Sequence, residues 1–125
     1  MPATPVTVLV VEDDPVILRL LEVNFELEGF RVLTAHDGEE GIGLIRSERP
    51  DVIISDIMMP NVSGIELVKA VKGDAELSST PIILLSAKAQ SVDLKDGIDA
   101  GADDYITKPF EPLDLVDRVN ALLAR

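Results

Sequence analysis

The stretch DVIISDIMMP, residues 51–60, decides how the rest of the chain is organised. It begins with a short apolar run, Val52 to Ile54, whose β-branched residues predict a fully buried strand rather than a helix. Asp56 follows where that strand ends, and Pro60 stops the segment. In open parallel sheets, ligands bind at the carboxyl ends of the strands, so Asp56 is a candidate binding or reactive residue. A simple turn-capping aspartate is the alternative, and this stretch alone leaves both interpretations open.

Apolar runs and helical patterns alternate along the whole chain. Further strands are predicted at residues 6–11, 30–35, 81–85 and 104–107. Helices are predicted at residues 15–28, 39–47, 65–71, 91–100 and 113–123. Asp14 and Pro15 fit the cap and first residue of the first helix, and Gly29 its end. We expect this helix to bury Ile17, Leu20, Leu21 and Leu27, and we expect a turn at Asp37–Gly38.

Near-continuous apolar strands joined by helices indicate a parallel sheet covered on both faces. Right-handed crossovers leave a doubly wound open sheet or a barrel, and five units are too few for a TIM barrel. The sequence therefore predicts an α/β fold with a single doubly wound five-stranded parallel sheet. We expect the flavodoxin-like strand order 2-1-3-4-5 with five flanking helices, so that strands 1 and 3 flank the switch point.

The composition excludes several classes of protein. The 125 residues predict one domain over residues 1–125, with residues 1–5 as a flexible N-terminal tail. The chain has no cysteine, so disulfides and thiolate chemistry are excluded. No apolar run approaches the ~20 residues of a membrane span, and no signal-peptide pattern is present, so we expect a cytoplasmic protein without membrane contact. The net charge of −12 disfavours direct binding of nucleic acid.

Polar residues gather where the predicted strands end. Glu12 and Asp13 follow the first strand and Asp56 the third, so their carboxylates should repel one another unless a cation is bound. Oxygen ligands alone favour a hard cation, and Mg²⁺ fits best. Ser86 and Lys108 follow the fourth and fifth strands. A metal, a carboxylate, a hydroxyl and a lysine together indicate phosphoryl transfer, with Asp56 as the nucleophile that becomes an aspartyl phosphate.

Four motifs in this order resemble the receiver domain of two-component response regulators, a chemotaxis-type, flavodoxin-like family. The matching segments are VVEDDP (10–15), SDIMMP (55–60) with Gly64, LSA (85–87) and GADDYITKPF (101–110). The resemblance covers essentially the whole chain, and the joint order and spacing of these motifs are highly specific.

The resemblance implies a phosphorylation-activated signalling switch rather than an enzyme with a separate substrate. Asp56 would accept a phosphoryl group from a phosphohistidine on a sensor histidine kinase or a histidine phosphotransfer protein in a phosphorelay. Asp13 and Asp56 would bind Mg²⁺ directly, Glu12 through water, and the carbonyl of Met58 would complete the protein ligands.

Lys108 would contact the phosphoryl group, and its bond to Pro109 is expected to be cis. Ser86 would move toward the phosphoryl oxygens, while Tyr105 turns inward to fill the vacated space.

The resemblance also indicates where the signal leaves the domain, at the face formed by the fourth helix, fifth strand and fifth helix. In receivers that control winged-helix transcription factors, this face dimerises through acid–base pairs between subunits. Asp103, Asp104 and Arg118 match that pattern, and Asp114 can replace its usual acid. Leu94 stands where a basic residue is usual, with Lys95 displaced by one position. We therefore expect at most a weak homodimer, or a monomer that offers this face to a downstream effector.

Each of these residues also has an ordinary structural interpretation. Glu12 and Asp13 alone would be surface acids, Lys108 a solvated lysine, Ser86 a turn hydroxyl and Tyr105 an aromatic at the edge of the core. Only their joint placement at neighbouring strand ends favours a site. The side chains of Met58 and Met59 fit loop packing better than chemistry, and His36 fits an exposed position.

Other functional classes fit less well. A haloacid-dehalogenase-like phosphatase would need a second aspartate at position 58, where this chain has Met58. A flavodoxin-type FMN binder would need a Ser/Thr/Gly-rich phosphate loop after the first strand. A degenerate receiver that only mediates protein contacts would normally have lost Asp56, Lys108 or an acid, and all are present. The sequence does not identify the kinase, the input signal, the output partner, an effector domain after Arg125 or the phosphoryl lifetime.

Overall fold

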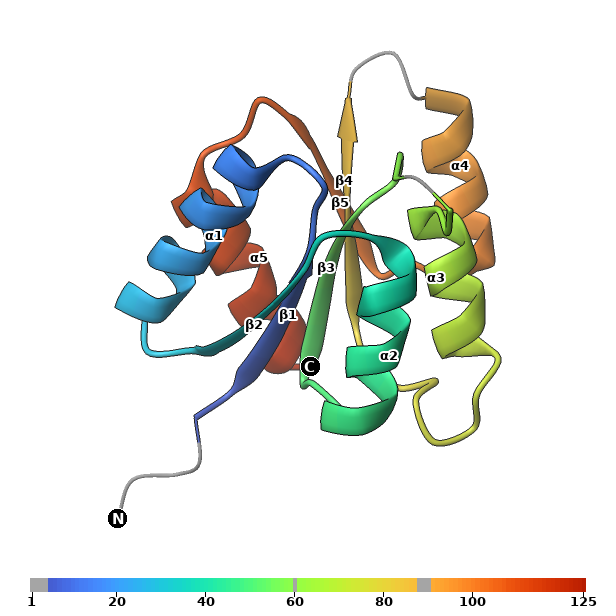
Figure 1. The fold of residues 1–125 in the computed structure, drawn as a ribbon, viewed down its shortest axis with the longest axis horizontal. Helices are drawn as coiled ribbons and strands as arrows, with labels where there is room; N and C mark the ends of the chain where they lie inside the picture. Colours follow the sequence, from blue (N-terminus) through green and yellow to red (C-terminus); the bar gives the residue numbers. More distant parts are fainter. Residues whose placement is uncertain (1–4, 60, 88–90) are drawn as a thin grey trace.

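The computed structural model describes residues 5–59, 61–87 and 91–125, with the backbone alone for residues 91–94. Strands and helices alternate as predicted, and their ends agree with the predicted ranges to within two residues (Figure 1). The strands are β1 (Thr7–Val11), β2 (Arg31–Ala35), β3 (Val52–Asp56), β4 (Ile82–Ala87) and β5 (Asp104–Lys108). The helices are α1 (Pro15–Leu27), α2 (Gly38–Glu48), α3 (Gly64–Lys72), α4 (Ser91–Ala100) and α5 (Pro112–Leu123). Residues 1–4 of the predicted flexible tail lie outside the described residues.

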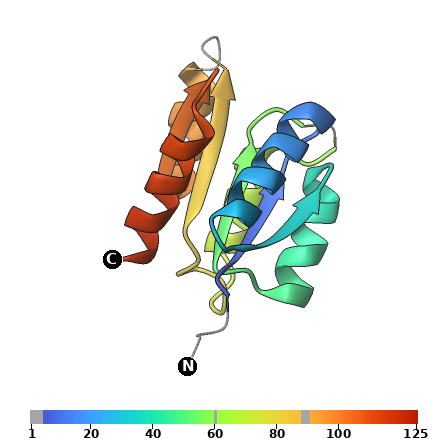
Figure 2. The ribbon, with the colours of Figure 1, turned by 90° about the vertical axis from the view of Figure 1, so that its left-hand side faces the viewer.

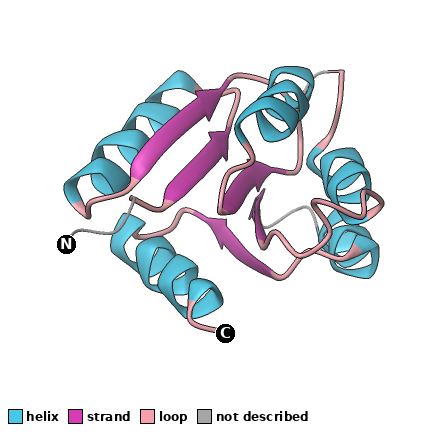
Figure 3. Cartoon of the chain, turned by 90° about the horizontal axis from the view of Figure 1, so that it is seen from below, coloured by secondary structure: helices cyan, strands magenta, loops and turns pink. Residues whose placement is uncertain are grey.

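The sheet has five parallel strands in the order β2-β1-β3-β4-β5, which confirms the predicted topology (Figure 3). The register places the strand ends nearly level with one another. Val11 lies beside Ser55, Asp56 beside Leu85, and Ala87 beside Lys108. As a result, the residues at the end of β1, β3 and β5 share one edge of the sheet.

Two apolar layers cover the two faces of the sheet, because successive strand residues point to opposite sides. Helices α1 and α5 lie on one face, while α2, α3 and α4 lie on the other (Figures 1 and 3). Val10 and Ile54 pack under α1 and α5, and their neighbours Val11 and Ile53 pack under α2 and α3. The central strands are therefore buried on both sides, which explains why their sequences are almost continuously apolar.

Short polar side chains fix where helices α1 and α2 begin. The Asp14 carboxylate accepts hydrogen bonds from the backbone N–H of Val16 (2.9 Å) and Ile17 (3.4 Å), which confirms the predicted cap. The predicted turn at Asp37–Gly38 is instead the start of α2, because Asp37 caps that helix by accepting from Glu40 N–H at 2.8 Å. Gly29 follows α1 with φ +91°, where a side chain would be strained.

One expectation about helix faces needs correction. Helix α1 buries Leu18, Leu21 and Phe25, whereas Leu20 and Leu27 are exposed. Of the four predicted core positions, only Leu21 is fully buried. Helix α2 has a glycine, Gly41, where it packs against the sheet. A side chain there would collide with Val11 of β1, so this glycine allows the helix to approach the sheet closely.

No helix among the described residues has the length and apolar character that a membrane crossing requires.

The Asp103 carboxylate joins three separate segments at the edge of the sheet remote from Asp56. One oxygen accepts from Lys72 Nζ of α3 (3.0 Å) and from Ile82 N–H of β4 (2.9 Å), and the other accepts from Arg125 (3.0 Å). Partial burial raises the pKa of Asp103, but these donors and charges outweigh it and leave the pKa below its usual value.

We therefore predict that Asp103→Asn lowers the free energy of unfolding by about 1–3 kcal/mol at pH 7, because charge-assisted hydrogen bonds are lost. A lowered folded-state pKa contributes stability that is complete above the unfolded-state pKa of about 3.9 and is lost as pH falls through the folded-state pKa. The difference in free energy of unfolding between the unsubstituted protein and Asp103→Asn should therefore become smaller below about pH 4. Urea titrations at several pH values would measure it. Asp117→Asn, the same charge change at an exposed position of α5, is the control; equal effects of the two substitutions at every pH would contradict this account.

Candidate functional site

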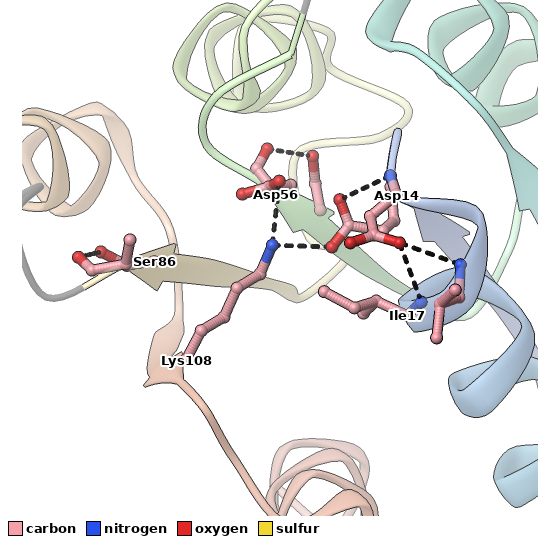
Figure 4. Close-up of polar contacts among 9 residues, drawn as sticks. Asp14, Ile17, Asp56, Ser86 and Lys108 are labelled. Carbon is pink, nitrogen blue, oxygen red and sulfur yellow. Dashed lines mark hydrogen bonds and ion pairs between the residues drawn. The ribbon is translucent and has the colours of Figure 1, made fainter.

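The candidate site lies at the carboxyl edge of the sheet and is assembled by strand ends (Figure 4). Glu12 and Asp13 directly follow β1, Asp56 is the last residue of β3, and Lys108 is the last residue of β5. The backbone N–H of Glu12 donates to the Ala35 carbonyl at 3.0 Å, which extends the β1–β2 ladder by one residue. The sheet itself therefore fixes the backbone positions from which these side chains extend.

Three carboxylates lie close enough to share one cation. Oxygens of Glu12, Asp13 and Asp56 all lie within 4.8 Å of one another; Glu12 and Asp56 are buried, and Asp13 is exposed. Burial raises the pKa of Glu12 to about 7, the neighbouring Asp56 acts in the same direction, and Lys108 opposes them. A cluster made only of hard oxygen ligands, open to solvent at Asp13, fits the coordination chemistry of Mg²⁺.

Lys108 bridges the two buried carboxylates. Its Nζ lies 2.7 Å from Glu12 Oε1 and 3.1 Å from Asp56 Oδ2 (Figure 4). Partial burial lowers the pKa of Lys108, but its bond to Glu12 and the charge of Asp56 outweigh this, so the net pKa is raised and the amine stays protonated. One lysine facing three carboxylates leaves the site negative, which further favours a bound cation.

The loop after β3 approaches the site through a glycine. A side chain on Gly64 would collide with the backbone carbonyl of Asp56, and the Gly64 N–H donates to the Ile57 carbonyl at 2.8 Å. The sequence resemblance singled out Gly64 without a reason, and this close approach supplies one. The predicted cis bond between Lys108 and Pro109 is confirmed.

Ser86 and Tyr105 are not drawn into the acidic cluster. The buried Ser86 hydroxyl donates to the Ala87 carbonyl at 3.0 Å, and Figure 4 shows Ser86 apart from the Asp56–Lys108 pair. Tyr105 is 42% exposed, and its backbone carbonyl accepts from Arg118 at 2.8 Å. The structure thus brings together Glu12, Asp13, Asp56 and Lys108, and it leaves the expected roles of Ser86, Tyr105 and Met58 as predictions.

Two supporting contacts were missed by sequence reasoning. The buried Ser55 hydroxyl donates to the Asp56 carbonyl at 2.9 Å, and a lone serine in an apolar strand was the available signal. The backbone N–H of Asp14 approaches Glu12 Oε2 at 3.5 Å, a contact that sequence patterns do not encode.

The charges expected to pair between subunits are paired within the chain. Asp103 binds Lys72 and Arg125, as described above, while Arg118 contacts Asp104 at 3.2 Å and Asp114 at 3.5 Å. Lys95 is exposed, and the side chain of Leu94 lies outside what the structure describes. These intramolecular pairs weaken the argument for a strong dimer through this face.

An apolar groove of about 330 Å³ opens beside the site. It is lined by Ile17 and Leu20 of α1 and by Lys108, Pro109 and Phe110 after β5. Because Lys108 belongs to both, the groove and the acidic cluster adjoin each other.

Comparisons with known proteins agree on one family. Residues 8–120 match the model of the response regulator receiver domain. The chain is 42% identical over 118 residues to the transcriptional regulatory protein CseB of Streptomyces coelicolor, covering 94% of this chain and 49% of that protein. It therefore spans about half the length of such relatives.

Solved structures show the same similarity. The receiver domain of Francisella response regulator 1452 is 39% identical with a TM-score of 0.87, and 98% of each chain is covered. The receiver domain of sensor histidine kinase PA1611 from Pseudomonas aeruginosa is 27% identical with a TM-score of 0.89, covering 98% of this chain and 100% of that one. That structure has a magnesium ion coordinated in its active site cleft.

The crowded carboxylates lead to a prediction about stability. Without divalent cations, Asp13→Asn should raise the free energy of unfolding by about 0.5–1 kcal/mol, because one repulsive charge is removed. Mg²⁺ at roughly ten times its Kd should stabilise the unsubstituted protein by about 1.4 kcal/mol and the variant much less. Thermal or urea unfolding with chelator and with millimolar Mg²⁺ would measure both effects, with Asp117→Asn as the control. If the unfolding transition of the unsubstituted protein is the same with and without Mg²⁺, the cation site is ruled out.

Proposed function

The chain belongs to the response regulator receiver domain family, and from this premise we propose that Asp56 is the phosphoacceptor of a two-component signalling switch. The observation that carries the proposal is the placement of a buried strand-end carboxylate within reach of Lys108 and two further acids. We propose that residues 1–125 form one receiver domain, located in the cytoplasm. As a receiver it is a signalling phosphoacceptor rather than an enzyme that turns over a separate substrate.

We propose that Glu12, Asp13, Asp56 and the Met58 carbonyl hold Mg²⁺, as oxygen ligands of the kind this ion prefers. When bound, Mg²⁺ neutralises charge on the transferring phosphoryl oxygens. The magnesium ion in the PA1611 receiver, together with the carboxylate cluster of this chain, supports the assignment.

The chemistry assigned to Asp56 is displacement at phosphorus. A carboxylate oxygen of Asp56 forms a bond to the phosphorus of a phosphohistidine, and the phosphorus–nitrogen bond breaks to release the imidazole. Lys108 already lies 3.1 Å from Asp56, so its ammonium is placed to hold the transferred group as an ion pair. Phosphorylation places a dianionic group next to Glu12, so Lys108 is expected to shift from Glu12 toward the phosphoryl oxygens.

The proposed partners follow from this chemistry. A sensor histidine kinase or a histidine phosphotransfer protein donates the phosphoryl group, and its reactive histidine has to reach the site edge beside the Lys108 groove. A downstream effector protein or domain reads the result; relatives such as CseB are transcriptional regulatory proteins about twice as long as this chain. The net charge of −12 argues against nucleic-acid binding by this domain itself.

Ser86 and Tyr105 are the proposed switch. The Ser86 hydroxyl would exchange its hydrogen bond to the Ala87 carbonyl for one to a phosphoryl oxygen. The Tyr105 ring would then turn from solvent into the space that Ser86 vacates. The change would alter the face of α4, β5 and α5, where a dimer is at most weak because Asp103, Asp104 and Arg118 pair within the chain.

The phosphoacceptor assignment predicts a single adduct. Incubation with Mg²⁺ and acetyl phosphate or phosphoramidate should add one phosphoryl group, labile to hydroxylamine, as measured by intact-protein mass spectrometry. Asp56→Asn should abolish the adduct because the nucleophile is lost, whereas Asp117→Asn should leave it unchanged. An adduct that persists in Asp56→Asn would refute the site.

The switch assignment predicts a fluorescence change. Tyr105 is the only tyrosine and the chain has no tryptophan, so tyrosine emission reports on this residue alone. Phosphorylation should reduce the quenching of Tyr105 fluorescence by acrylamide, because the ring moves out of solvent. Asp56→Asn should abolish the change and Ser86→Ala should diminish it. Equal quenching before and after complete phosphorylation would exclude the inward movement while leaving the phosphoacceptor assignment intact.

A further inference from the structure

Helix α1 carries apolar residues on the face opposite its buried face. Leu18, Leu21 and Phe25 pack against the sheet. The residues that define what we call the α1 stripe are Val16, Leu20, Val23 and Leu27, which are 75%, 45%, 36% and 77% exposed. At about 100° per residue, the stripe spans roughly 60° and is centred on the side away from the core. An ordinary surface helix carries polar residues on that side.

The spacing of the α1 stripe is that of a coiled-coil seam. Its members are separated by four, three and four residues, the alternation that brings apolar positions repeatedly to one contact line. Helix α1 lies next to α5 over the same face of the sheet, and its side away from the strands faces outward (Figure 2). Isolated exposed apolar residues are common, whereas an aligned set over three turns indicates a contact surface.

We propose that the α1 stripe is the contact surface of a homodimer in which α1 packs antiparallel against α1 of a second copy. The four–three–four spacing is the same in both directions, so a two-fold axis can superpose the stripe on itself. Val16 then meets the partner's Leu27, and Leu20 meets the partner's Val23. Each of the four layers thus pairs one valine with one leucine, which keeps the two helices at an even separation.

The charges beside the stripe select the antiparallel arrangement. Arg19 and Glu26 lie on the same flank of the α1 stripe, seven residues apart. Equivalent flanks face each other in an antiparallel pair, so Arg19 meets the partner's Glu26 at two symmetric positions. A parallel pair would place Arg19 opposite the other flank, which carries Ile17 and Asn24. The present pair of Arg19 with Glu22 at 2.8 Å is exposed and therefore free to exchange.

The size of the surface indicates a weak dimer. Helix α1 is 13 residues long, which corresponds to ~20 Å. We expect a contact of this length to bury less than the ~1,200 Å² typical of stable complexes, and therefore a micromolar or weaker Kd. Leu20 also lines the groove that leads to Lys108, so the dimer would cover that groove. Self-association and docking of a phosphodonor protein there would exclude each other.

Sedimentation of the full chain from about 10 μM to about 1 mM would test the dimer. Salt of about 0.15 M would screen the net charge of −12. The average mass should rise toward that of a dimer. Arg19→Glu and Glu26→Arg should each weaken association about tenfold, because like charges then face each other. An equimolar mixture of the two variants should associate again, because both pairs become attractive.

Arg46→Glu is the matched control, with the same charge change at an exposed position of α2; it should leave association unchanged. A monomer at all concentrations would overturn the proposal, as would equal effects of Arg19→Glu and Arg46→Glu, or a mixture that associates no better than its components. Phosphorylation of the Val23→Glu variant would be compared with a histidine phosphodonor protein and with phosphoramidate. If the unsubstituted protein is a monomer and the substitution slows only the reaction with the phosphodonor protein, the dimer proposal is overturned. The α1 stripe would then be the docking surface for that protein. Circular dichroism would check that each variant is folded.

Discussion

The bridge from Lys108 to Glu12 and Asp56 is the interaction on which the site depends. Two buried carboxylates at neighbouring strand ends repel each other, and burial makes that repulsion costly. Lys108 reaches them from β5 and offsets one negative charge, while Asp13 keeps a third carboxylate within 4.8 Å at the solvent side. The remaining negative charge destabilises the edge of the sheet and, for the same reason, suits it to a divalent cation.

Much of the fold could be predicted because buried parallel strands have an unmistakable composition. The runs around Val10 and Ile54 mark strands buried on both faces, and the crossover rules then leave little choice of topology. The faces of the helices were harder to predict. In α1, apolar residues lie on both the buried and the outward side, so periodicity alone did not separate Leu18 from Leu20. The close approach of Gly41 to Val11 depends on helix–sheet distance, which local sequence does not encode.

The site was predicted where backbone geometry determines it. Glu12, Asp13, Asp56 and Lys108 meet because parallel strand ends meet, whatever their side-chain conformations. The partners of Asp103 and Arg118 depend instead on which charged side chains come within reach in three dimensions, and these residues proved to pair within the chain. The positions of Ser86 and Tyr105 are expected to change with the phosphoryl group, so neither sequence nor this structure fixes their active arrangement.

A double-mutant cycle between Glu12 and Lys108 tests this electrostatic account most directly. The free energies of unfolding of the unsubstituted protein, Glu12→Gln, Lys108→Met and the double variant would be measured without divalent cations at pH 8, above the raised pKa of Glu12. We expect a coupling energy above about 1 kcal/mol, because the half-buried Lys108 ammonium lies 2.7 Å from the buried Glu12 carboxylate. Effects that add to within about 0.3 kcal/mol would show that Lys108 does not hold the carboxylates together, and would contradict the account.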